Sequence, residues 1–197
     1  MGTTQPIREK EQLTKFMEYY QTVCPSRRNY ALLIFGVYSA LRISDILALR
    51  WTDIYDFQEK IYRDHLFISE KKTGKSNVVA LNRHIKEVLE DYRQERNPVP
   101  GDYIFTKSTD YSSPLSRSQA FRIVKRAAEE ALHEEHISCH SLRKTFGYHA
   151  WKQGTPPALL MDIYNHSSYR ITKKYLGIEQ DERDSIFLSM DIFGSNS

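Results

Sequence analysis

Apolar residues recur at helical spacing through the early part of the chain. They fall at i, i+3, i+4 and i+7 within residues 8–23, which predicts an amphipathic helix. The uncharged residues 29–41 are too few to span a bilayer, so a buried helix is predicted over residues 30–41. Ser44 then suits the N-cap of a short helix that runs to Trp51.

The middle of the chain changes from helical to strand character. Residues 65–69 and 77–81 are rich in branched and aromatic side chains, and the sequence KKTGK between them is a hairpin signal. Together they predict an antiparallel β-ribbon. A polar loop is predicted over residues 107–114.

Helical periodicity dominates the remainder. Helices are predicted over residues 83–96, 116–133 and 141–153, and short helices are expected to fill the rest. The second of these is predicted from the spacing of Phe121, Val124, Ala128 and Leu132, and Gly154 closes the third. The predicted fold class is therefore mainly α with one small antiparallel β-ribbon.

Length and composition favour one domain. The 197 residues with 40% hydrophobic positions suffice for one core, and no internal repeat or linker divides them. We therefore expect residues 1–197 to form a single domain. The two cysteines give neither a disulfide framework nor a paired-thiol metal pattern, and the amino terminus has no apolar signal core, so a cytoplasmic location is expected.

Charge is spread unevenly along the chain. The net charge is only +3, but residues 59–86 carry seven basic against three acidic side chains, and residues 165–175 carry three basic and none acidic. Residues 179–191 reverse the sign, with five acidic side chains against Arg183. A polyanion would therefore meet the middle and late segments. Charge alone leaves open the alternative that these are solvated basic helix faces.

Most enzyme signatures are missing from the sequence. It has no glycine-rich phosphate loop, no dinucleotide fingerprint, no G-x-S-x-G and no H-E-x-x-H. Residues 133–136, which read HEEH, and His140 could present two imidazoles to a metal, but the third and fourth ligands are missing. An ordinary helix end rich in His and Glu is the favoured interpretation.

A different group of residues suits a phosphodiester. His140 and Arg143 are spaced i, i+3 and so emerge on one helix face, where they can converge on one anion. Arg42 follows the predicted buried helix and offers a second fork-shaped donor. Tyr175 lies nine residues after His166 in a purely basic context, which can supply the cations that a tyrosine nucleophile needs.

The order of these residues along the chain is similar to that in a known family. Over roughly residues 7–193 the chain resembles the catalytic domain of tyrosine recombinases, the phage integrase family. The resemblance rests on Ala40-Leu41-Arg42-Ile43-Ser44-Asp45, Lys72, His140-Ser141-Leu142-Arg143, His166-Ser167-Ser168 and Tyr175. Before the second histidine, where the family usually has leucine and glycine, this chain has Tyr164 and Asn165.

The resemblance implies a fold and a chemistry. The fold is that of DNA breaking-rejoining enzymes, and the activity is site-specific recombination through a covalent 3′-phosphotyrosine bond to Tyr175. Arg42 and Arg143 would grip the non-bridging oxygens of the scissile phosphate. Lys72 would protonate the leaving 5′-hydroxyl.

Further roles follow from the same resemblance. His140 would serve in proton transfer with the nucleophile, His166 would hydrogen-bond the phosphate, and Asp45 would orient the Arg42 region. No metal or nucleotide cofactor is expected, because neighbouring cations replace the magnesium of other phosphoryl-transfer enzymes.

The expected partner is double-stranded DNA at a specific recombination site of a mobile element, bound by a homotetramer that is monomeric when free. The acidic tail would pack onto a neighbouring protomer. Candidate DNA contacts, chosen from position and charge, are Lys75, Arg117, Arg122, Lys144, Arg170 and Lys173.

Two alternatives remain open at this point. A type IB topoisomerase uses the same chemistry without strand exchange, and a non-catalytic DNA-binding regulator could keep the scaffold. An amino-terminal core-binding domain is not evident, so the chain is expected to be either a catalytic fragment or a short recombinase similar to fimbrial invertases.

Overall fold

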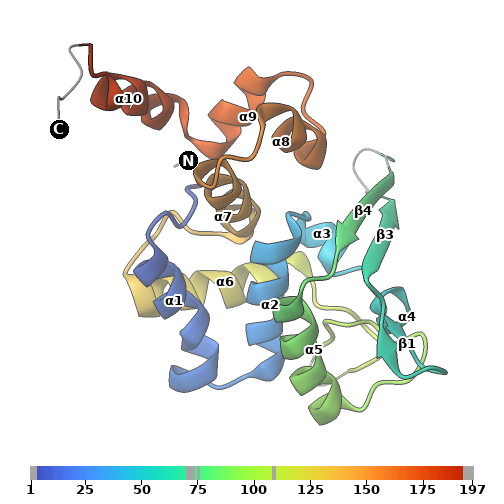
Figure 1. Cartoon of the computed structure of the whole chain (residues 1–197). Helices are drawn as coiled ribbons and strands as arrows, with labels where there is room; N and C mark the ends of the chain where they lie inside the picture. The colour runs from blue at the N-terminus through green and yellow to red at the C-terminus, as the bar shows by residue number, and fades with distance from the viewer. Residues whose placement is uncertain (1–3, 70–73, 75, 108–109, 193–197) are drawn as a thin grey trace, which may run out of the picture.

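The computed structural model describes residues 4–69, 74, 76–107 and 110–192. Its elements are α1 (Lys10–Glu18), the π-helical turn η1 (Tyr19–Val23), α2 (Arg27–Ser39), α3 (Ile43–Ile46), α4 (Trp51–Ile54), β1 (Tyr55–Asp56), β2 (Ile61–Tyr62), β3 (His65–Ser69), β4 (Ser76–Ala80), α5 (Arg83–Arg96), α6 (Arg117–Leu132), α7 (Cys139–Lys152), α8 (Pro157–Tyr164), α9 (Tyr169–Leu176) and α10 (Glu179–Ser189). The mainly helical class is confirmed (Figure 1).

Both sheets of the described residues are two-stranded and antiparallel. The predicted ribbon is β3 paired with β4, in a register that sets His65 opposite Ala80 and Ser69 opposite Ser76. The pairing of β1 with β2 was not predicted, because two-residue strands leave too short an alternation to recognise.

Helix ends account for most differences in bounds. α2 begins at Arg27, because the Ser26 hydroxyl accepts a hydrogen bond from the Asn29 amide at 3.3 Å. The N-cap assignment of Ser44 was wrong: this residue lies inside α3, whose N-cap is Arg42. The reason is the left-handed backbone of Ala40 (φ 55°), which reverses the chain at once and lets the next helix start early.

The central helix is α2, which packs against α1, α5 and α7 (Figure 1). Its residues from Ala31 to Val37 are all buried. Gly36 allows α7 to approach closely, since a Cβ atom there would lie 2.6 Å from Leu142 Cδ1.

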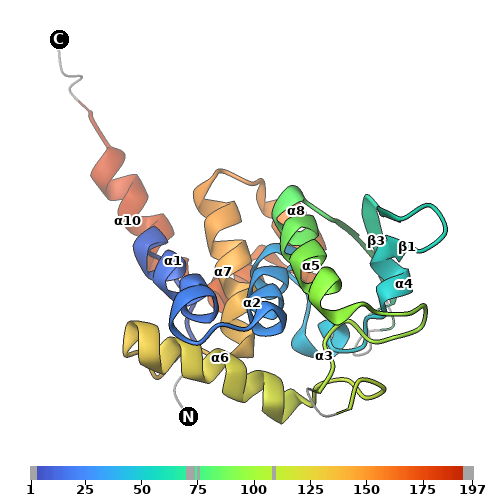
Figure 2. The same cartoon turned by 90° about the horizontal axis from the view of Figure 1, so that it is seen from below.

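Helix α6 lies along α1, as Figure 2 shows. Of the residues whose spacing predicted this helix, Val124 and Ala128 are buried, but Phe121 is 47% exposed, so its expected place on the buried face was wrong. Ala120, Ile123 and Ala127 complete the buried face.

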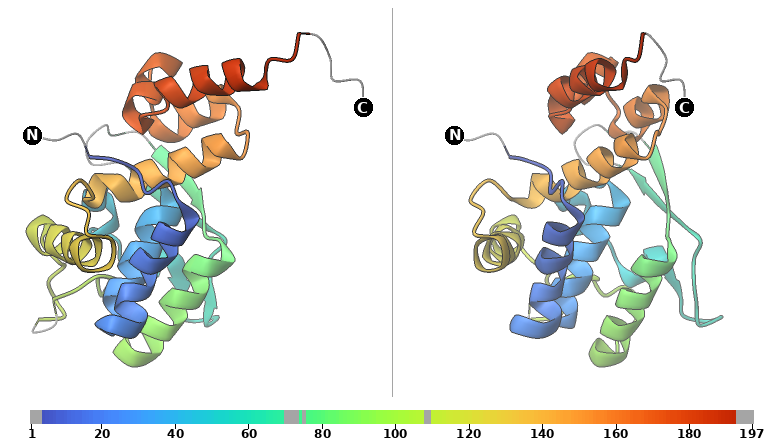
Figure 3. Two further views of the ribbon diagram at one scale, coloured as in Figure 1. Left: turned by 90° about the vertical axis from the view of Figure 1, so that its left-hand side faces the viewer. Right: turned by 60° about the vertical axis from the view of Figure 1, so that its left-hand side comes forward.

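A smaller apolar cluster joins α7, α8 and α9 above the main core. It consists of Tyr148, Tyr164, Leu176 and Ile178. Beyond it, α10 projects away from the body of the molecule, and none of its residues is buried (Figure 3). Within the described ranges no helix is long and apolar enough to cross a membrane.

The segment of residues 4–8 lies across α7. The Ile7 amide donates to Thr145 Oγ1 at 2.9 Å. The Arg8 guanidinium donates to the Gly177 carbonyl at 2.7 Å and pairs with Asp181 at 2.8 Å. This segment therefore ties α7 to the junction between α9 and α10.

Candidate active site

Arg143 is a buried cation at the meeting point of three elements. It lies in α7 and is 3% exposed. Its Nη1 donates to the carbonyl of Ala40, which the left-handed backbone at the end of α2 presents to it. Its Nη2 donates to the carbonyl of Tyr164 at 3.5 Å, at the end of α8. These main-chain acceptors fix the plane of the guanidinium.

Arg42 lies close in sequence to Ala40, the residue whose carbonyl binds Arg143. It is half-buried and forms the N-cap of α3, two residues after Ala40. Asp45 is 1% exposed, and its amide donates to the Arg42 carbonyl at 2.9 Å, so α3 holds the backbone of Arg42 in place. Burial is the largest cause of both nearby pKa shifts, lowering the pKa of His166 and raising that of Tyr175, and the positive charge of Arg42 acts on both groups in the lowering direction.

Tyr175 faces these cations from α9. Its ring lies 5.3 Å from the His166 ring, edge to face, and 5.4 Å from the Tyr164 ring, against which the Arg143 guanidinium also packs at 4.6 Å. Burial raises the pKa of Tyr175, and the neighbouring arginines lower it by less, so the pKa remains above its ordinary value. The phenol is therefore protonated at neutral pH and must lose its proton to act as a nucleophile.

His166 completes the cluster. It follows Asn165, whose left-handed backbone (φ 55°) ends α8 and turns the imidazole back over the site. Its Nδ1 lies 3.0 Å from Thr172 Oγ1 on α9, which fixes the ring orientation. Burial, together with the charges of Arg143 and Arg42, lowers the pKa of His166, so the imidazole is neutral at pH 7.

The structure thus brings together Arg42, Arg143, His166 and Tyr175 from three separate stretches of sequence. His140 is exposed in the first turn of α7, one turn before Arg143. Lys72 and Lys75 lie outside the described residues, although the flanking strands β3 and β4 are described.

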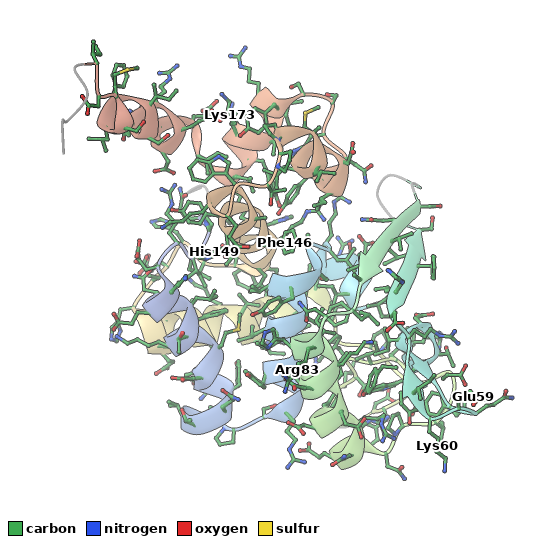
Figure 4. The ribbon with its side chains drawn as sticks, in the orientation of Figure 1. Glu59, Lys60, Arg83, Phe146, His149 and Lys173 are labelled. Atoms are coloured by element: carbon green, nitrogen blue, oxygen red, sulfur yellow. The ribbon has the colours of Figure 1, made fainter. Side chains whose placement is uncertain are left out.

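The expected DNA contacts have different surroundings. Arg117 and Arg122 on α6 and Arg170 on α9 are exposed. Lys173 pairs with Glu182 at 2.8 Å, at the junction of α9 and α10 (Figure 4). Lys144 does not fit its expected place on an accessible surface.

The Lys144 side chain is instead enclosed by the amino-terminal segment and α9. The residue is 7% exposed, and its amine donates to the Thr4 carbonyl at 2.7 Å. The same amine lies 5.2 Å from the centre of the Tyr175 ring. Burial lowers the pKa of Lys144.

Two residues of the cluster were not predicted, Tyr164 and Thr172. Tyr164 is fully buried, and its ring lies 5.4 Å from that of Tyr175. The sequence signal for Tyr164 was its position directly before Asn165, a residue type suited to end a helix in the left-handed conformation. Thr172 had no signal of its own, since its role depends on how α9 packs against His166.

Comparison with known proteins agrees with this geometry. Residues 7–182 match the model of the phage integrase family. The chain is 39% identical over 181 residues to the probable integrase/recombinase YoeC of Bacillus subtilis, covering 92% of this chain and 93% of YoeC. It is 32% identical over 162 residues to the type 1 fimbriae regulatory protein FimE of Escherichia coli K12, covering 79% and 78% of the two chains.

Solved structures share the fold. The XerA recombinase superimposes with a TM-score of 0.75 at 18% identity, covering 98% of this chain and 68% of XerA. The XerH site-specific recombinase, in a post-cleavage complex with its difH substrate, gives 0.75 at 22% identity, covering 95% of this chain and 54% of XerH. With a family model that matches nearly the whole sequence and a relative similar along almost its full length, the chain belongs to the phage integrase family of tyrosine recombinases.

Proposed function

We propose that this recombinase cleaves double-stranded DNA at a specific site by attack of the Tyr175 hydroxyl on the scissile phosphate. The P–O5′ bond breaks, the 5′-hydroxyl leaves with a proton, and a 3′-phosphotyrosyl bond forms; the reverse reaction with another 5′-hydroxyl rejoins strands. The observation that carries the proposal is that the Arg143 guanidinium and the Tyr175 phenol pack against the same ring, that of Tyr164, at 4.6 and 5.4 Å, beside the His166 imidazole. Nucleophile and phosphate-binding cation therefore occupy one site.

The surrounding residues have complementary roles in this proposal. Arg42 and Arg143 hold the non-bridging oxygens and stabilise the charge that builds up in the transition state. His166, neutral at pH 7, hydrogen-bonds the phosphate. His140, exposed one turn before Arg143, takes part in moving the Tyr175 proton. No nucleotide is consumed, because the phosphotyrosyl bond conserves the phosphodiester energy.

Covalent trapping tests the proposal. The wild-type chain is incubated with nicked duplexes from the DNA that flanks its own gene, in the presence of EDTA, and resolved on a denaturing gel. Loss of the short strand beyond the nick prevents religation, so a cleaving enzyme accumulates as a slower-migrating protein–DNA band. A non-catalytic DNA-binding regulator would give no such band even when a mobility shift proves that DNA is bound.

Lys72 is proposed as the general acid that protonates the leaving 5′-oxygen. Replacing it with alanine should slow cleavage by roughly 10²–10⁴-fold on ordinary DNA. A 5′-phosphorothiolate substrate should restore the rate, because a sulfur leaving group needs no proton. Single-turnover cleavage of both substrates measures this. Equal impairment of Lys72→Ala on both would assign the proton to another group.

The assembly proposed on synapsed DNA is a homotetramer, in which α10 packs onto a neighbouring protomer. The support is the exposure of its apolar side chains: Phe187 is 80% exposed and Leu188 86%. Acidic residues occupy its first turn. A surface that is apolar and exposed in a single chain is suited to contact between protomers.

Replacing Phe187 and Leu188 together with serine should therefore abolish the tetramer on DNA while single chains still fold and bind. Analytical ultracentrifugation of protein–duplex mixtures distinguishes the species. Val23→Ser is the matched control, because Val23 is also exposed (72%) but lies on η1. A tetramer that persists in the α10 double variant would exclude this helix as the contact.

A further inference from the structure

Tyr164 is the one described side chain whose ring contacts three of the residues proposed for the chemistry. The Arg143 guanidinium carbon lies 4.6 Å from the ring centre. The His166 ring stacks on it at 5.5 Å with an interplanar angle of 27°. The Tyr175 ring lies 5.4 Å away, tilted by 52°. Tyr164 itself has no exposed surface, so it cannot contact DNA directly.

The hydroxyl of Tyr164 joins α8 to the backbone of α7. It donates a hydrogen bond to the Arg143 carbonyl at 2.6 Å. This oxygen therefore lies against the backbone of α7, beside the turn between Arg143 and Gly147. Burial raises the pKa of Tyr164, so the phenol stays neutral and keeps its proton for the Arg143 carbonyl.

The fold reserves space for this hydroxyl. A Cβ atom on residue 147 would lie only 2.4 Å from the Tyr164 oxygen. Glycine is unfavourable inside a helix, and Gly147 lies inside α7. Packing explains its presence, because Tyr164 and Leu176 approach the backbone so closely that a side chain would not fit.

We propose that Tyr164 is a positioning residue for strand cleavage, which holds the Arg143 guanidinium, the His166 imidazole and the Tyr175 phenol in their relative places. This inference rests on the proposed function. The ring is a flat apolar surface against which a cation and an imidazole both pack, and the hydrogen bond from its hydroxyl to the Arg143 carbonyl fixes the position of the ring relative to α7.

The contact with Arg143 is reciprocal. The Tyr164 hydroxyl donates a hydrogen bond to the Arg143 carbonyl, and the Tyr164 carbonyl accepts one from Arg143 Nη2 at 3.5 Å. A tyrosine that only filled the core would not need to form both of these hydrogen bonds with Arg143, the residue proposed to bind the phosphate. Since misplacement of a phosphate-binding group by about 1 Å can cost 10²-fold in rate, this arrangement bears on the chemistry.

The test compares two tyrosine-to-phenylalanine variants with the same local chemistry. Tyr20 is also buried, and its hydroxyl also donates to a main-chain carbonyl, that of Ile123, at 3.0 Å. Tyr164→Phe and Tyr20→Phe should lower the melting temperature by similar amounts. Single-turnover cleavage of the nicked duplex at saturating protein should fall about 10-fold for Tyr164→Phe and stay at the wild-type rate for Tyr20→Phe.

DNA affinity, measured by mobility shift, should be unchanged in both variants, because neither side chain reaches the surface. Tyr164→Leu removes the ring as well and should slow cleavage about 100-fold or more. If Tyr164→Phe and Tyr164→Leu cleave at the wild-type rate once corrected for folded protein, the residue is only a core residue and the inference is wrong. If the wild-type chain itself forms no covalent product, the proposed function fails first.

Discussion

Tyr175→Phe is expected to abolish the covalent protein–DNA product completely. The substitution removes one oxygen atom, and no other atom of the side chain can form the phosphotyrosyl bond. The ring stays in place, because its contacts with His166 at 5.3 Å and Tyr164 at 5.4 Å are made by carbon atoms that phenylalanine keeps. DNA binding and the melting temperature should therefore remain close to wild type while cleavage disappears. Denaturing gels of suicide-duplex reactions measure the loss.

Tyr169→Phe is the matched control for this variant. Tyr169 lies on the same helix, α9, and its hydroxyl donates to Glu182 at 3.0 Å, away from Arg143. It should retain full cleavage. A covalent band that persists in Tyr175→Phe and vanishes in Tyr169→Phe would move the nucleophile to Tyr169.

Local signals in the sequence explain which elements could be predicted. α5 spans the predicted residues 83–96, because the Asn82 side chain caps it and a regular apolar face continues to its end. The predicted ribbon appears as β3 and β4 for the same kind of reason, a local alternation around a turn. Where the signal was a cap residue alone, as at Ser44, the positive φ of Ala40 overrode it.

The site residues could be proposed from residue type and order, but their environments could not. Lys144 reads as one more surface cation next to Arg143 in the sequence. Its burial depends on Thr4, a residue 140 positions away whose carbonyl meets the lysine only in the folded chain. Tyr164 is similar: its contacts with Arg143 require the close approach of α7 and α8 that Gly147 permits. Long-range packing of this kind leaves no periodic pattern along the chain.

Arg143→Ala is expected to reduce the rate of strand cleavage by at least roughly 10³-fold, because it removes a preorganised fork of donors from the scissile phosphate. The substitution would also destabilise the folded protein. The Ala40 carbonyl would lose its buried partner, and the Tyr164 ring would lose the cation 4.6 Å above it. We expect a lower melting temperature, and the cleavage rate is therefore measured below the transition, per folded molecule. DNA binding should weaken far less than cleavage, since exposed arginines such as Arg117 remain.

Arg96→Ala separates the chemical effect from the structural one. The Arg96 side chain is 10% exposed, pairs with Asp102 at 3.4 Å and lies 3.6 Å from the centre of the Tyr111 ring, so its removal also deletes a largely buried cation stacked on a tyrosine. Both variants should be destabilised, but Arg96→Ala should cleave at the wild-type rate below its melting transition. Equal cleavage by the two variants would mean that Arg143 supports only the fold. A cleavage defect confined to Arg143→Ala would indicate that the guanidinium acts on the phosphate, because the loss of a buried, ring-stacked arginine is common to both.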